Sequence, residues 1–250
     1  ELNNLFINFS KNDLSWFIYD YIGKRQSIDL KIKKTGENNF LVSEKNNIDL
    51  PYSVGLLKND SIVYSKIYSK TGKIELPEVD FDYIAVNPSI KLPEFNRNNN
   101  WIYNKSRSNL KPLKFKFIGD LENPKYRNIY YRPEVTYNLY DGISPGVNLI
   151  NRGIKNRPLS FEIFTQYASK EEALVGSMNF RYQLNNEIKD NYSTLFNLFY
   201  TTNHYNENLR YQVFSPSILI NFRDNKNLRS KIKRSISLSM FNVNKENNTL

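Results

Sequence analysis

Apolar and polar residues alternate along successive segments in the second half of this chain. The clearest apolar series are Leu174, Gly176, Met178, Phe180, Tyr182 and Leu184, and Ile236, Leu238 and Met240. Side chains of a β-strand point to opposite faces with a period of two, so each segment has one apolar face and one polar face. Since no helical stretch interrupts these segments, they predict an antiparallel transmembrane β-barrel whose outer face meets lipid and whose inner face meets water.

The strand-like segments follow one another from residue 113 onward. They cover 113–118, 129–140, 145–152, 159–168, 173–184, 194–203, 209–222 and 230–243. A tilted membrane strand needs about nine to eleven residues, whereas strands of soluble proteins usually have about five or six. We therefore assign 113–250 to strands of an outer-membrane β-barrel. We expect more strands to follow, because the chain ends on Asn247-Asn248-Thr249-Leu250 rather than on a strand with a terminal aromatic residue.

In each strand, the polar positions are expected to face the lumen and the apolar positions the lipid. The predicted lumen residues are Asn179, Arg181, Gln183, Ser235, Ser237 and Ser239. The predicted lipid-facing residues of the last segment are Ile236, Leu238 and Met240. A shift of one residue in register would reverse this assignment.

Only the first part of the chain, residues 1–27, carries a helical pattern. The apolar residues at helical spacing are Leu14, Phe17, Ile18 and Tyr21, with Ser10 or Asn12 as the N-cap, Asp13 in the first turn and Gly23 as the stop. A single helix of this length is marginal, so its apolar face needs a partner. We expect that partner upstream, which makes residues 1–27 the end of an upstream helical domain.

Between residues 28 and 92 the hydrophobic period changes to two. Leu30 and Ile32 alternate with Lys31 and Lys33, and similar short segments follow. Turn signals separate them at Thr35-Gly36-Glu37, Lys58-Asn59-Asp60 and Lys70-Thr71-Gly72. Short strands at this spacing predict a small antiparallel β-sandwich. Residues 93–112 are polar, rich in Asn and bounded by prolines, which predicts a linker between the sandwich and the barrel.

The composition provides no catalytic or metal-binding constellation. The chain has no cysteine and one histidine, His204, in a polar, turn-like stretch where an exposed loop imidazole is expected. One histidine cannot form a two-histidine zinc site, and no Ser or Cys motif for a triad is present. We therefore assign no catalytic, cofactor-binding or metal-binding residue in these 250 residues.

The chain is basic, with a formal net charge of +10 and a pI near 9.4. Its Lys and Arg residues are scattered along strands and turns rather than gathered on one helix or in a known nucleic-acid module. We therefore expect no nucleic acid among its partners. The 18 Tyr and 16 Phe residues fit a core and a membrane interface, where aromatic rings with a polar tip are favoured.

Several short motifs resemble a known family. They are Asp13-Leu14-Ser15-Trp16-Phe17 with Tyr21-Ile22, Asp49-Leu50-Pro51-Tyr52-Ser53-Val54, Leu92-Pro93-Glu94-Phe95-Asn96-Arg97-Asn98-Asn99 and Tyr140-Asp141-Gly142-Ile143-Ser144-Pro145-Gly146. With these motifs the chain resembles the C-terminal part of a membrane-anchored, Bacteroidetes-type relative of the gluzincin aminopeptidases, the zinc metallopeptidases typified by membrane alanyl aminopeptidase. The resemblance implies an upstream metallopeptidase-like domain that ends in residues 1–27. In that family two histidines of an H-E-x-x-H motif and a downstream Glu hold the zinc, and no residue here can take those roles. Zinc is therefore expected upstream and not in this fragment.

The sequence supports one leading hypothesis and two alternatives. The leading hypothesis is the non-catalytic C-terminal fragment of an outer-membrane, metallopeptidase-like protein, whose barrel contacts lipid and anchors the peptidase domain on the periplasmic or outer face. The first alternative is an outer-membrane transport or assembly barrel, whose lumen residues would set selectivity. The second is a soluble β-rich binding module. Whether the parent protein is an active peptidase is left open.

Overall fold

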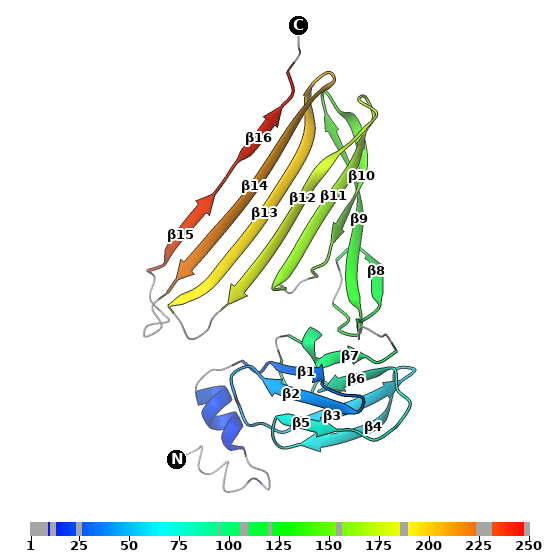
Figure 1. Cartoon of the computed structure of the whole chain (residues 1–250), viewed down its shortest axis with the longest axis vertical. Helices are drawn as coiled ribbons and strands as arrows, with labels where there is room; N and C mark the ends of the chain where they lie inside the picture. Colours follow the sequence, from blue (N-terminus) through cyan, green and yellow to red (C-terminus); the bar gives the residue numbers. More distant parts are fainter. Residues whose placement is uncertain are drawn as a thin grey trace. The chain divides into compact units, whose positions relative to one another are not determined.

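The computed structural model describes residues 10, 14–23, 27–94, 96–105, 110–119, 122–153, 157–185, 190–223 and 232–247. Strands account for most of these residues. The chain forms two compact units. The first contains Glu1–Pro112 and Asn123–Arg127, and the second contains Leu113–Glu122 and Asn128–Leu250 (Figure 1).

The first unit contains two antiparallel sheets. The three-stranded sheet has the order β1 (Leu30–Lys34), β2 (Asn39–Glu44), β5 (Gly72–Glu75). The four-stranded sheet has the order β4 (Ser61–Tyr68), β3 (Tyr52–Lys58), β6 (Tyr83–Val86), β7 (Trp101–Tyr103). Along β1, Leu30 and Ile32 are buried while Lys31 and Lys33 are exposed, as the period of two requires.

Buried apolar side chains from both sheets form one core. Leu30, Phe40 and Val42 of the first sheet belong to the same cluster as Val54 and Ile84 of the second. Two sheets that share one apolar core are a β-sandwich. The sandwich predicted for this part of the chain is therefore present.

The linker prediction for residues 93–112 was wrong for its central part. Residues Asn98–Asn100 form the short helix η2, and Trp101–Tyr103 form β7, which pairs with β6 in the sandwich. Trp101 and Ile102 are buried. The Asn-rich composition was misleading because these polar side chains make hydrogen bonds inside the sandwich instead of facing solvent.

Glu94 is the centre of these hydrogen bonds. Its carboxylate accepts hydrogen bonds from the backbone N–H of Leu30 (3.1 Å), from Asn87 Nδ2 (2.7 Å) and from Asn100 Nδ2 (2.8 Å). Burial raises the pKa of this carboxyl above its ordinary value, although the three hydrogen bonds act in the opposite direction. Glu94 thus connects the segment before β7 to β1 and to the end of β6.

The predicted helix is present at the expected position, but its packing partner differs from the one expected. Helix η1 (Trp16–Gly23) is a π-helix that ends at Gly23, whereas Asn12 and Asp13 lie outside the described residues. Trp16 and Tyr21 pack against the sandwich core. The partner expected upstream is therefore provided by this chain, through a contact between segments that are distant in sequence.

The second unit is a single nine-stranded sheet. It contains β8 (Leu113–Phe117), β9 (Arg127–Asn138), β10 (Gly142–Ile150), β11 (Leu159–Ala168), β12 (Ala173–Asn185), β13 (Asn191–Asn206), β14 (Leu209–Phe222), β15 (Arg234–Ser239) and β16 (Asn242–Lys245). The strands follow one another in sequence order, and both β15 and β16 pair with β14. Antiparallel registers join β9 to β14. The strand predicted at 230–243 thus forms as two short strands, and the others differ from their predicted ranges only at their ends.

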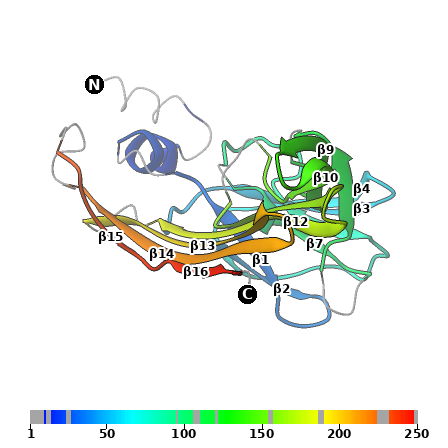
Figure 2. The ribbon, with the colours of Figure 1, turned by 90° about the horizontal axis from the view of Figure 1, so that it is seen from above.

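The two edges of the large sheet are β8 and the β15–β16 pair. No pairing joins these edges within the described residues, so the sheet is open. It is also curved, because β9 and β10 turn away from the arc formed by β12–β15 (Figure 2). The prediction of a mainly β, antiparallel fold is confirmed, while the closed barrel stays a prediction.

Candidate functional site

One face of the large sheet is apolar over seven successive strands, β9 to β15, and we call it the apolar face. The strand registers place its residues in rows across the sheet. One row is Leu159, Tyr182, Phe196, Ile218 and Leu238, and another is Tyr131, Leu149, Ile163, Met178, Tyr200 and Phe214. The apolar residues at every second position of each strand therefore form one continuous surface across the sheet.

The apolar face is exposed and uncharged. Leu174 is 64% exposed and Leu238 is 70% exposed, and many of their neighbours on this face are also exposed. No charged residue occupies the positions of this face in the ranges 131–137, 143–149, 159–167, 174–184, 194–202, 212–222 and 236–240. Monomeric soluble proteins rarely expose apolar patches above a few hundred Å². This surface is thus built for an apolar environment.

The apolar face extends along most of the length of β12. From Leu174 to Leu184 it measures about 34 Å at 3.4 Å per residue. A strand of this length tilted by about 40°, the usual tilt in outer-membrane barrels, rises about 25 Å, which is the height of the apolar band of those barrels. Aromatic residues are frequent on it, and two pairs, Phe161 with Phe180 and Tyr182 with Phe196, have ring centroids 6.1 and 6.4 Å apart.

The opposite face, which we call the polar face, carries the alternate residues of the same strands. Several of its polar residues are buried, namely Ser144, Asn148, Ser160, Gln166, Ser193 and Ser215. The residues predicted to face a lumen, Asn179, Arg181, Gln183, Ser235, Ser237 and Ser239, all lie on it. Between β10 and β14 the sheet thus buries several polar side chains on one face and exposes large apolar ones on the other, the reverse of a soluble sandwich.

Hydrogen bonds connect the polar face across β9, β10 and β11. Asn148 Nδ2 donates to Glu162 Oε1 (2.8 Å) and to Glu134 Oε1 (3.3 Å). Glu134 also forms an ion pair with Arg132. Gln166 Nε2 donates to the carbonyl oxygen of Ser144 (3.1 Å). Glu134 is thus paired with a cation on the same face, whereas Glu162 accepts a hydrogen bond from the neutral amide of Asn148.

His204 was predicted as an exposed loop residue, and this prediction was wrong. It lies in β13, is 5% exposed, and its Nδ1 lies 2.6 Å from Oδ1 of Asp141. Arg210 Nε donates to His204 Nε2 at 3.3 Å. Both ring nitrogens of His204 therefore have a polar partner, Asp141 at Nδ1 and Arg210 at Nε2.

Asp141 belongs to the turn between β9 and β10, although β13 is not adjacent to these strands in the sheet. Its carboxylate also accepts a hydrogen bond from Asn138 Nδ2 (2.9 Å) and the N–H of His204 (3.4 Å). The cluster therefore connects turns at one end of the curved sheet (Figure 1). Residues 201–206 resembled a turn because they are polar, but they pair with β14 and are strand residues.

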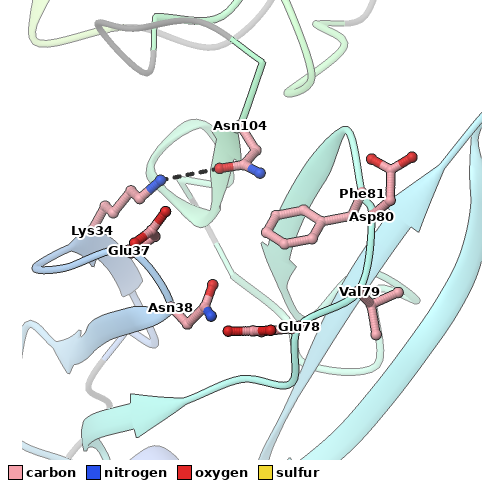
Figure 3. A pocket seen from close by; sticks show the side chains of 8 residues that line it. All are labelled: Lys34, Glu37, Asn38, Glu78, Val79, Asp80, Phe81 and Asn104. Carbon is pink, nitrogen blue, oxygen red and sulfur yellow. Dashed lines mark hydrogen bonds between the residues drawn. The ribbon is translucent and has the colours of Figure 1, made fainter.

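The sandwich contains a polar depression of about 560 Å³. Lys34, Glu37, Asn38, Glu78, Val79, Asp80, Phe81 and Asn104 line it (Figure 3). Lys34 Nζ donates to Asn104 Oδ1 (3.1 Å), and Lys58 forms an ion pair with Asp80 (2.5 Å). Its side chains provide neither a nucleophile next to a base nor a set of metal ligands, and the residues described by the structure contain no His, Cys, Asp and Glu group that could hold a metal ion.

None of the helices in the described part of the chain has the length and apolar character needed to cross a bilayer.

No protein-family model, no curated protein and no solved structure matches the chain. The two faces of the large sheet are thus the features from which a function can be inferred.

Proposed function

We propose that residues 113–250 form part of an outer-membrane β-barrel that anchors the β-sandwich at the membrane. The observation that carries this proposal is the exposed apolar face, which is uncharged in the central parts of seven strands and backed by a polar face. In water, each large apolar side chain on it would forgo about 1.5–3 kcal/mol of burial free energy. In a bilayer the same side chains contact lipid, and the polar face lines a wet interior.

The lengths of the connections support the same proposal. The turns between β9 and β10, β11 and β12, and β13 and β14 are short, whereas the connections between β10 and β11 and between β14 and β15 at the other end are longer. Outer-membrane barrels have short periplasmic turns and longer extracellular loops. The end that carries Asp141 and His204 is therefore proposed to face the periplasm.

The proposal also includes an upstream zinc metallopeptidase-like domain, which rests on the residue resemblance alone. In this proposal the sandwich and the sheet position that domain and take no part in its chemistry. The 250 residues alone should bind no stoichiometric zinc and hydrolyse no aminoacyl substrate. Metal analysis and a peptidase assay on these residues and on the longer parent protein test this part. Zinc that is found only in the parent protein supports it, and the lack of zinc in both proteins excludes it.

Membrane fractionation tests the anchoring function. The protein should fractionate with the outer membrane and resist extraction by carbonate or high salt. If its +10 charge alone held it at the surface, salt would release it, because screening acts within about 10 Å at 0.1 M. Recovery in the soluble fraction would exclude the proposal in favour of a soluble β-rich module.

A matched pair of variants in the middle of β12 gives a second test. Met178 lies on the apolar face and Ser177 on the polar face. Met178→Arg should lower the free energy of unfolding from lipid by about 2–4 kcal/mol, the cost of an arginine near the bilayer midplane. Ser177→Arg should cost much less, because its side chain faces water. Equal costs for the two variants would contradict the assigned orientation.

A further inference from the structure

Arg181 lies near the middle of the polar face without a charged partner. The registers place it in a row with Ser160 of β11, Asn197 of β13, Ser217 of β14 and Ser239 of β15. This row contains hydroxyl and amide groups and no carboxylate. Within the described part of the chain, no ion pair includes Arg181.

Arg181 is partly enclosed, and several polar atoms in its surroundings lack hydrogen-bond partners. Its Nε is buried and has no hydrogen-bond partner among the described residues, and the same holds for Oδ1 of Asn197 and of Asn179. The side chain as a whole is half-buried, so the outer part of the guanidinium remains accessible. A buried donor without an acceptor costs about 1–3 kcal/mol, and more when it is charged. An acceptor from solution would remove that cost.

The nearby charged groups do not neutralise Arg181. Glu162 is the cross-strand neighbour of Asn179, diagonal to Arg181, and its Oε1 accepts a hydrogen bond from Asn148. Arg132, the other arginine on the polar face of β9–β14, is paired with Glu134. The two arginines therefore differ: Arg132 forms an ion pair within the sheet, and Arg181 does not.

We propose that Arg181, with Asn197 and Ser160, binds an oxyanion, a phosphate or a small carboxylate, on the polar face. A guanidinium is planar and presents a fork of N–H donors that fits two oxygens of such an anion. The hydroxyl of Ser160 can donate to the same anion, and the amide of Asn197 does so when its Nδ2 is turned toward it. The site rests on the proposed function, because it requires the polar face to line a water-filled interior.

The test measures binding of inorganic phosphate, acetate and chloride to the full chain folded in detergent, by calorimetry at constant ionic strength. Phosphate or acetate should saturate one site, and chloride should not compete at the same concentration. Arg181→Gln should weaken oxyanion binding by about tenfold or more, as expected for the loss of a bidentate, charge-assisted contact. Arg181→Lys, which keeps the charge but not the fork, should give an intermediate loss.

Arg132→Gln is the matched control, because it removes a paired arginine from the same face. It should change oxyanion binding by less than about threefold. Equal losses in Arg132→Gln and Arg181→Gln, displacement by chloride, or no saturable binding by the folded wild-type chain would overturn the proposal. If Arg181→Gln fails to fold, unchanged binding by Arg181→Lys also overturns it, because the fork is then not needed.

Failure of the anion site is distinguishable from failure of the anchoring function. A protein that remains in the outer membrane, and in which Met178→Arg is costlier than Ser177→Arg, but that does not bind oxyanions at Arg181, loses only the anion site. A protein that fractionates as soluble loses both proposals, because the polar face would then line no membrane interior.

Discussion

At the scale of single residues, Glu94 and Asp141 show how buried polar groups hold irregular segments in place. Glu94 receives three hydrogen bonds from separate segments of the sandwich. Asp141 receives hydrogen bonds from Asn138 and His204 in the large sheet. A buried polar group is expensive to leave unpaired, so these contacts specify their segments more strictly than apolar contacts do.

The raised pKa of Glu94 predicts a pH dependence of the sandwich. The ordinary value for the unfolded chain is 4.5, and in the folded state the carboxyl holds its proton to higher pH. Between these two values the folded state binds more protons than the unfolded state, so stability should fall as pH rises through this window. The measurement is the urea midpoint between about pH 4 and pH 7.

Glu94→Gln should remove this slope, since the amide does not titrate. Glu37→Gln, at an exposed position in the connection between β1 and β2, serves as the control and should keep it. If the slope persists in Glu94→Gln, it has another origin.

The pair formed by Asp141 and His204 predicts a large, coupled effect on the sheet. Asp141→Asn or His204→Gln should each lower the free energy of unfolding by about 1–3 kcal/mol, because each disrupts a buried, hydrogen-bonded polar pair. The double variant should cost much less than the sum of the two. Asp190→Asn, at an exposed position next to β13, is the control. Additive costs in urea unfolding from lipid would mean that the pair is not coupled.

At the scale of elements, the strands β10 to β12 approach one another unusually closely at two glycines. A Cβ at Gly146 would lie 2.4 Å from the carbonyl oxygen of Thr165. A Cβ at Gly176, where φ is +141°, would lie 2.0 Å from the carbonyl oxygen of Phe164. Glycine in a strand often marks such a bend or close approach. These glycines thus contribute to the curvature of the sheet.

Gly176→Ala should destabilise the sheet by about 2 kcal/mol or more, because the methyl group meets backbone and the backbone conformation is strained for alanine. Gly119→Ala is the matched control, since nothing lies within 4 Å of its added Cβ. Unfolding from lipid by urea measures both. A tolerated Gly176→Ala would show that the strands can separate at this point without cost.

The orientation of β15 gives a second prediction for an element. Leu238 pairs with Ile218 on the apolar face, and Ser237 pairs with Leu219 on the polar face. Leu238→Arg should cost about 2–4 kcal/mol of unfolding free energy from liposomes, and Ser237→Arg far less. The reverse order would indicate that the register is shifted by one residue, because such a shift moves every side chain to the other face.

At the scale of the whole molecule, the two units bury their residues in opposite ways. The sandwich has an apolar core, whereas the large sheet exposes its apolar face. The sandwich should therefore fold in water, and the sheet should need lipid or detergent. Both tryptophans of the chain, Trp16 and Trp101, belong to the sandwich unit. Their fluorescence reports on that unit separately from the sheet.

Removing detergent should leave the tryptophan emission unchanged while the circular dichroism signal of the sheet is lost. In urea, the two signals should give separate transitions. Protein without lipid or detergent is the control, because only the transition of the sandwich should then be seen. A single transition seen by both probes would mean that the units unfold together.

The strands and their two faces could be predicted from the sequence alone. Side-chain direction in a strand depends only on local backbone geometry, so Leu174 and Met178 share a face wherever the strand lies. For the same reason the alternation of Leu30 and Ile32 with lysines was sufficient to predict a sandwich strand. The boundary near residue 112 was also visible, because the strand length and the composition change there.

The burial of polar residues and the pairing of distant segments became known only from the tertiary structure. His204 and Glu94 are buried by partners 63 and 64 residues away along the chain, and no local pattern encodes such distances. The absence of a carboxylate from the cross-strand row of Arg181 also depends on the registers of several strands. The helix η1 found its partner in the sandwich for the same reason. Period and propensity are local properties, whereas burial and pairing depend on contacts between segments that are distant in sequence.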